Sequence, residues 1–210
     1  MGSAFKRSKK KIRIRKSTMF NFADWHLKDA QISARGAKSC TLQKGPKCEK
    51  VTFTLGEKDT PVSSPFGATS FNDETNGSSR RTIEFNLSAE QEEIFQNFDE
   101  WACAYLSENS ERIFRKALSI DQIREGYRSP VTKKGSYKGH LRCKINLSGT
   151  SAVRCWDEKK QRIAVPADLR NCELIPRVSI SHLWLMSREY GRVFQVNDLQ
   201  VIQSEEECPF

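Results

Sequence analysis

One amphipathic segment, residues 88–109, limits most strongly how this chain can fold. Ser88 followed by Gln91 forms a capping box, and the acids of the first turn suit the positive end of a helix dipole. Apolar side chains then recur at helical spacing, at Ile94, Phe95, Phe98, Trp101, Ala102, Tyr105 and Leu106. The pattern predicts a long helix with one apolar face, and we interpret that face as core packing rather than as a ligand site.

The segments around this helix alternate in the manner of β-strands. β-Branched and aromatic residues alternate with polar ones in the predicted strands, at residues 51–55, 82–87, 141–147, 152–156, 162–165, 177–186 and 192–202. Gly191 marks a hairpin turn between the last two strands, and shorter helices are expected at 110–117 and 119–125. These elements predict an α+β fold, mainly β. Their number suits an OB-type Greek-key β-barrel with an inserted amphipathic helix, although periodicity alone leaves a β-sandwich open.

Charge and composition divide the chain into three parts. Residues 6–16 hold eight Lys or Arg side chains and no acid, so residues 1–17 are expected to form a flexible basic arm. Residues 18–203 are expected to form a single domain that is long enough to bury a core. Residues 204–210 form an acidic, aromatic-ended tail in which the charged and aromatic positions are Glu205, Glu206, Glu207 and Phe210.

Each flanking segment has two interpretations. The arm is either a phosphate-binding or nuclear-import segment or a solubilising tail. The acidic tail is either a frayed terminus or a tethered peptide that docks in a basic groove or on a partner.

The domain is itself electrically polarised. The chain carries a net charge of +9, yet residues 88–111 contain seven acids and no Lys or Arg. Residues 124–162, in contrast, contain eleven Lys or Arg against three acids. Because a region of one sign attracts partners of the opposite sign, the basic region indicates an anionic partner.

Aromatic side chains are interleaved with the cations of this basic region. Arg142 and Lys144 fall on one face of the strand predicted at 141–147, with Cys143 and Ile145 on the other. Such a face suits single-stranded nucleic acid, because cations follow the phosphates while rings stack on unpaired bases. An ordinary solvated sheet face is the alternative.

Twelve residues make up the predicted nucleic-acid-binding set. Tyr137, on a polar loop, suits a base platform, whereas Trp156 and Trp184 are expected to pack in the core more readily than to stack on bases. The set consists of Tyr127, Arg128, Lys133, Lys134, Tyr137, Lys138, Arg142, Lys144, Arg154, Trp156, Arg188 and Tyr190.

Motifs of catalysis and metal binding are missing from the sequence. There is no phosphate-cradling Gly-rich loop with Lys and Ser/Thr, no Gly-x-Ser-x-Gly elbow and no zinc-type spacing among the seven Cys and three His residues. We therefore expect no enzyme activity, no cofactor and no metal. No apolar run approaches the about 18 residues of a membrane span, so no membrane partner is expected. An odd cysteine count without a signal peptide suggests reduced thiols in an intracellular compartment.

The order of these elements resembles a known family. Ser64-Pro65-Phe66-Gly67 follows an early strand, the acidic helix 88–109 comes next, and residues 118–130 read Leu-Ser-Ile-Asp-Gln-Ile-Arg-Glu-Gly-Tyr-Arg-Ser-Pro before the hairpin at 180–196. This order is similar to that of OB-fold single-stranded DNA-binding proteins of short-tailed phages and their relatives in large DNA viruses of eukaryotes. The tip Glu205–Phe210 is similar to the acidic tails of that class.

The resemblance implies a function in DNA replication, recombination and repair. The protein would coat and protect single-stranded DNA, and its tail would recruit replication proteins or compete with DNA for the basic groove. It would act in the nucleus or at a viral replication site. The long basic arm and short tail depart from the phage pattern, which leaves open the strength of autoinhibition and whether the protein forms a homodimer.

Two other functions fit the same charges. A virion or nucleic-acid-packaging protein would bind mainly through the basic arm. An RNA-binding module would use the same aromatic and basic side chains, because recognition of the 2′-hydroxyl leaves no simple sequence signature.

Overall fold

The computed structural model describes residues 20–29, 31–32, 38–69, 80–170, 172–186 and 188–202. The predicted arm, residues 1–17, and the predicted tail, residues 204–210, lie outside the described residues. The basic region 124–162, which carries most of the predicted nucleic-acid-binding set, lies within them.

The described residues form one fifteen-stranded sheet and three α-helices. The strands are β1 (Trp25–Leu27), β2 (Gln31–Ile32), β3 (Lys38–Lys44), β4 (Glu49–Lys50), β5 (Thr52–Thr54), β6 (Val62–Ser63), β7 (Ala68–Thr69), β8 (Arg80–Asn86), β9 (Tyr127–Arg128), β10 (Val131–Thr132), β11 (His140–Asn146), β12 (Arg154–Trp156), β13 (Arg162–Ile163), β14 (Glu173–Leu185) and β15 (Tyr190–Ile202). The helices are α1 (Ala89–Glu108), α2 (Ser110–Phe114) and α3 (Ile120–Gly126), and a 3-10 turn, η1, spans Phe22–Asp24.

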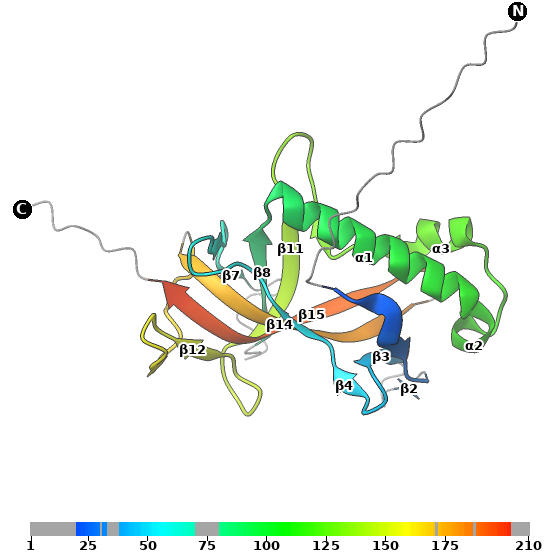
Figure 1. Cartoon of the computed structure of the whole chain (residues 1–210), viewed down its shortest axis with the longest axis horizontal. Coiled ribbons are helices and arrows are strands. Elements are labelled where there is room, and N and C mark those ends of the chain that lie inside the picture. The colour runs from blue at the N-terminus through cyan, green and yellow to red at the C-terminus, as the bar shows by residue number, and fades with distance from the viewer. Residues whose placement is uncertain are drawn as a thin grey trace, which may run out of the picture.

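The long antiparallel hairpin of β14 and β15 forms the centre of the sheet (Figure 1). β14 pairs along its other edge with β3, β5 and β6, and β15 pairs in parallel with β9, β11 and β12. β8 then pairs with β11, and β7 with β8. The structure confirms the predicted class, α+β and mainly β, with α1 inserted between β8 and β11. In the described part of the chain β1 and β7 share no pairing, so the sheet does not close into the predicted barrel.

Helix α1 packs its apolar face on the sheet, as the sequence predicts. Ser88 Oγ accepts a hydrogen bond from the Gln91 N–H, and Gln91 Oε1 accepts one from the Ser88 N–H, which completes the capping box. Phe95 and Phe98 are fully buried, with ring centroids 6.0 and 5.8 Å from that of Phe194 on β15. These contacts place the main core between α1 and the β14–β15 hairpin.

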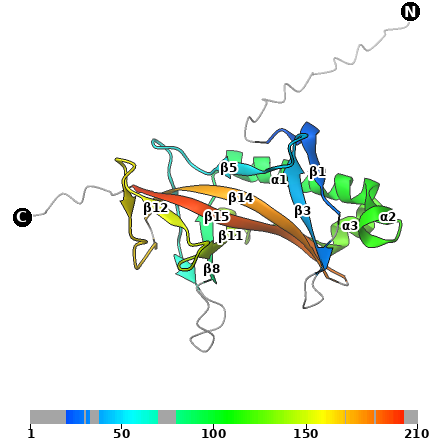
Figure 2. The same cartoon turned by 90° about the horizontal axis from the view of Figure 1, so that it is seen from below.

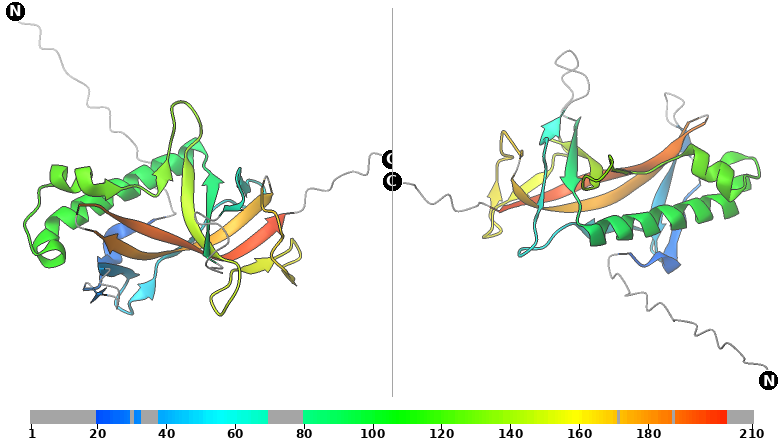
Figure 3. Two further views of the ribbon diagram at one scale, coloured as in Figure 1. Left: turned by 180° about the vertical axis from the view of Figure 1, so that it is seen from behind. Right: turned by 90° about the horizontal axis from the view of Figure 1, so that it is seen from above.

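The sheet has one face covered by helices and one that no described helix covers. The three helices lie on the same side of the β14–β15 hairpin (Figure 2 and Figure 3). We call the opposite side the outer face. Cys143 and Ile145 are buried on the covered side of β11, and Arg142 and Lys144 alternate onto the outer face. The predicted division of this strand is therefore confirmed.

Several predicted boundaries differ from the structure, including the end of one helix and the start of one strand. The helix expected at 110–117 ends at Phe114, because Arg115 adopts the left-handed conformation with φ of 60°. The strand expected from residue 152 begins at Arg154. Of the helices that the structure describes, none is both long and apolar enough to cross a membrane.

Candidate nucleic-acid interface

Trp184 lies on the outer face in one register row with Gly191 and Arg128. The pairing of β14 with β15 sets Trp184 opposite Gly191, and the pairing of β15 with β9 sets Gly191 beside Arg128. A Cβ atom on Gly191 would lie only 2.9 Å from Trp184 Cζ2 and 2.8 Å from the Arg128 carbonyl oxygen. Glycine therefore lets the half-buried indole approach the backbone closely, and the part of the ring that stays accessible can stack on a base.

Basic side chains gather beside this ring on the outer face. Lys144 Nζ donates to Thr82 Oγ1 at 2.9 Å, and no described carboxylate lies within ion-pair distance of it. Burial lowers the pKa of Lys144, and the charges of Arg142 and Arg80 lower it further. Burial and the Arg80 charge also lower the pKa of His182. Because these groups repel one another, a phosphate among them would be stabilising.

The ring and the cations border one shallow cavity, which we call the fork cavity. It lies where β11 separates from β15, a gap into which β9 and β10 fit. The cavity measures about 290 Å³ and is lined by Arg128, Ser129, Pro130, Arg142, Cys143, Lys144, Trp184, Arg192, Val193 and Phe194. No cluster of His, Cys, Asp or Glu that could hold a metal ion occurs among the residues that the structure describes.

Helix α1 holds the β9 side of the fork cavity in place. Asp99 accepts hydrogen bonds from the Tyr127 hydroxyl at 2.8 Å and from the Ser129 hydroxyl at 2.5 Å. Burial raises the pKa of the Asp99 carboxyl, and these two hydrogen bonds oppose that rise. Arg128, between the two anchored residues, pairs with Glu189 at 2.6 Å. Tyr127 thus supports the interface through its hydroxyl, whereas Arg128 faces the cavity.

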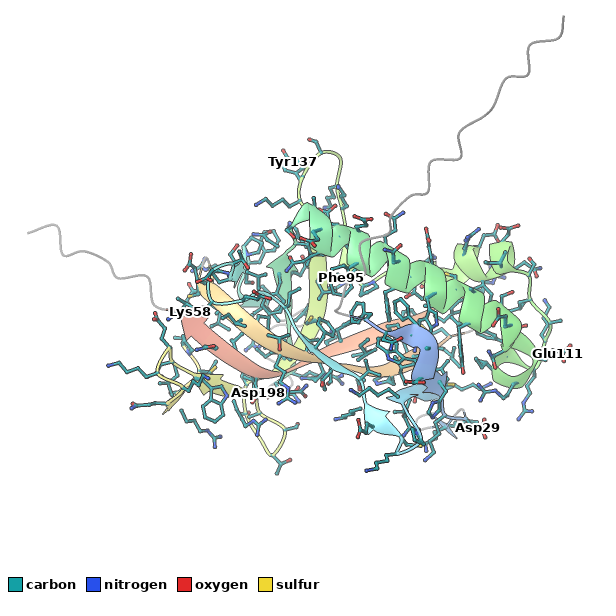
Figure 4. All side chains as sticks on the ribbon, in the orientation of Figure 1. Asp29, Lys58, Phe95, Glu111, Tyr137 and Asp198 are labelled. Carbon is teal, nitrogen blue, oxygen red and sulfur yellow. The ribbon has the colours of Figure 1, made fainter. Side chains whose placement is uncertain are left out.

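The predicted basic loop is attached to the start of α1. Lys133 Nζ and the Gly139 N–H donate to Glu92 at 2.5 and 2.6 Å, and the hydrogen bond from Lys133 is the main reason that the pKa of Glu92 is lowered. Tyr137 is 76% exposed and points away from the body of the protein (Figure 4). The loop also carries the exposed Lys134 and Lys138. It leads into β11 at His140, two residues before Arg142.

Three members of the predicted set, Arg128, Arg142 and Lys144, line the fork cavity, and four of the others lie in the β14–β15 hairpin or on β12. Tyr190 is only 5% exposed, and its hydroxyl donates to the Ile123 carbonyl at 2.6 Å. It is therefore a core residue, whereas the sequence predicted that it contacts nucleic acid. Arg154 Nε and Trp156 Nε1 contact the Asp198 carboxylate at 2.7 and 3.3 Å, on the half of β15 remote from Gly191. The fourth, Arg188, is exposed in the β14–β15 turn.

Sequence reasoning missed three residues of the outer face. We expected Trp184 to pack in the core, whereas it borders the fork cavity. The interleaved basic and aromatic pattern alone does not single out Arg80 or His182. Alternation in β14 carries a signal for two of them, because Leu183 and Leu185 are buried while His182 and Trp184, which alternate with them, face outward.

Comparisons with known proteins give similarities to solved structures of phage proteins, at low sequence identity. No protein-family model matches the chain, and no curated protein matches it. The chain is similar to gp2.5, a single-stranded DNA-binding protein encoded by bacteriophage T7, with 13% identity, a TM-score of 0.48, and coverage of 73% of this chain and 87% of that one. It is also similar to the single-stranded DNA-binding protein of bacteriophage Enc34 in complex with ssDNA, with 8% identity, a TM-score of 0.49, and coverage of 85% and 96%. A C-terminal truncation of the Enc34 protein gives 6% identity and a TM-score of 0.47, with coverage of 86% and 96%.

Proposed function

We propose that this chain binds single-stranded DNA on its outer face, at the fork cavity. One observation carries the proposal: the half-buried Trp184 ring lies against Gly191 and borders the same cavity as Arg128, Arg142 and Lys144. Proteins bind single-stranded nucleic acid by stacking bases on aromatic rings and by placing cations along the phosphates. The fork cavity has both kinds of side chain. The exposed Lys134 and Lys138 would extend the contact with phosphates beyond β11.

The same geometry favours single strands over duplex. A base must leave its stack and its partner before a ring set into a sheet face can contact it, whereas a duplex presents mainly phosphates. The free energy of binding is therefore expected to have two parts, one from base stacking and a salt-dependent one from phosphate contacts.

The cellular role that we propose is to coat and protect single-stranded DNA during replication, recombination and repair. The domain of residues 18–203 would bind the strand. The acidic tail, through Glu205, Glu206, Glu207 and Phe210, would recruit replication proteins or compete for the cationic outer face, and charge complementarity supports this. The free thiols of the described cysteines fit a reducing setting inside the cell, at the nucleus or a viral replication site.

Fluorescence anisotropy with labelled oligo-dT, matched duplex and matched RNA tests the proposal. The full chain should bind oligo-dT more tightly than duplex. Trp184→Leu should weaken oligo-dT binding by about 5- to 150-fold, since one stacked base contributes about 1–3 kcal/mol. Trp156→Leu is the matched control, because Trp156 is held by Asp198 far from the fork cavity, and it should leave the affinity unchanged.

Three outcomes would redirect the proposal. Equal affinity for duplex and oligo-dT would refute binding through stacked bases. Loss of all binding on deletion of residues 1–17 would favour a packaging protein that acts through its basic arm. Tighter binding to the matched RNA would favour an RNA-binding module.

A further inference from the structure

Phe66 is an exposed aromatic ring that core packing does not explain. It is 55% exposed, although phenylalanine has no polar atom to hydrate. It lies in the connection between β6 and β7, immediately before Gly67, whose φ is +63°. A Cβ atom on Gly67 would lie 3.0 Å from Arg170 Cγ and 3.2 Å from the Arg170 backbone nitrogen. The turn is thus pressed against residues 168–170, and this contact limits how far the turn can move.

The ring of Phe66 lies beside the outer face. Its centroid is 6.0 Å from that of His140, at an interplanar angle of 50°. His140 is the first residue of β11 and alternates onto the same face as Arg142 and Lys144, while Leu141 and Cys143 between them are buried. His140, Arg142 and Lys144 therefore form one row along β11. Phe66 lies at one end of this row and the fork cavity at the other.

The charges around this pair differ from those at the fork cavity. His140 Nδ1 lies 3.6 Å from Glu84, and Arg142 lies 3.9 Å from the same carboxylate. The local positive charge is thus partly balanced at this end of β11, whereas Lys144 at the other end has no described carboxylate within ion-pair distance. A neutral base suits the Phe66 end, and phosphates suit the Lys144 end.

We propose that Phe66, with the His140 imidazole beside it, is a second base-stacking position for the same single strand that contacts Trp184. This inference rests on the proposed function. From His140 to Lys144 the strand rises about 13 Å, at about 3.3 Å per residue. This path is longer than one nucleotide, so one single strand can contact both ends of β11.

The experiment is a length series of oligo-dT against the wild type, Phe66→Leu and Phe66→Trp, read by anisotropy. Leucine keeps an apolar side chain but loses the aromatic face. Phe66→Leu should therefore weaken binding of long oligomers by about 5-fold or more, since a stacked base contributes at least about 1 kcal/mol. Phe66→Trp should keep the affinity. Oligomers that are too short to span β11 should bind Phe66→Leu as they bind the wild type.

Ile32→Leu provides the matched control, because Ile32 is 71% exposed and lies on the short edge strand β2. It should bind oligomers of every length as the wild type does. Thermal unfolding of each variant checks that the fold is kept.

The two proposals fail in different ways. If the wild type shows no preference for oligo-dT over duplex, the proposed function itself fails. If Trp184→Leu weakens binding while Phe66→Leu leaves every oligomer unaffected, single-strand binding stands and the second position is refuted. An equal loss on short and long oligomers would also refute it, because the effect would then not depend on spanning β11.

Discussion

Replacing Lys144 with methionine should reduce the salt dependence of DNA binding by a calculable amount. Burial lowers the pKa of Lys144, and the charges of Arg142 and Arg80 lower it further; among the described contacts its ammonium group donates only to Thr82. Methionine keeps most of the side-chain length and removes the charge. The variant should fold at least as stably as the wild type, because it relieves repulsion between the cations.

The magnitude follows from counterion release. Each phosphate contact on a single strand contributes about 0.7 to the slope of log K against log salt concentration. Between about 50 and about 200 mM salt, the wild type should therefore lose about 2.6-fold more affinity than Lys144→Met. At about 0.1 M salt, the variant should bind about 5-fold more weakly.

The assay is anisotropy with oligo-dT at several salt concentrations. Lys116→Met is the matched control, because Lys116 is exposed in the connection between α2 and α3. Its slope should equal that of the wild type. An unchanged slope for Lys144→Met, or an equal decrease in both variants, would show that phosphates do not bind at the fork cavity.

Three further variants test the ring, the titrating group and the core. Gly191→Ala would place a Cβ atom 2.9 Å from the Trp184 ring, so it should weaken oligo-dT binding and change tryptophan emission; unchanged values would contradict the geometry. His182 has a lowered pKa, so the unfolded state binds more protons below about pH 6.5. Wild-type Tm should therefore fall more than that of His182→Gln between about pH 7 and about pH 5, and equal falls would contradict this. Phe98→Ala should lower the free energy of unfolding in urea by about 3–5 kcal/mol, and a loss below about 1 kcal/mol would show that α1 is not central to the core.

The sequence predicts most accurately those helices and strands whose formation depends on residues close together in the chain. The capping box at Ser88 and the spacing from Phe95 to Leu106 depend on neighbours within one or two turns, so they predict α1 without tertiary information. The alternation in β11 likewise separates Arg142 and Lys144 from the buried residues between them.

The members of the site depend on contacts that the sequence does not show. Tyr190 follows a turn, a position that predicts exposure, yet Gly126 of α3 lies so close that a Cβ atom added to it would be 2.7 Å from the Tyr190 ring. Trp184 could be assigned to a strand face, but only the position of α1 decides which face is covered. Arg154 and Trp156 are near Arg142 in the sequence, whereas β12 pairs with a remote part of β15.

Photo-cross-linking of oligo-dT that carries 5-iododeoxyuridine, followed by peptide mass spectrometry, tests the central claim most directly. If single-stranded DNA binds the outer face, cross-links should form at Trp184 in the fork cavity, and Trp156 should stay unmodified. Cross-links at Trp156 or on α1, with none in the fork cavity, would contradict the account.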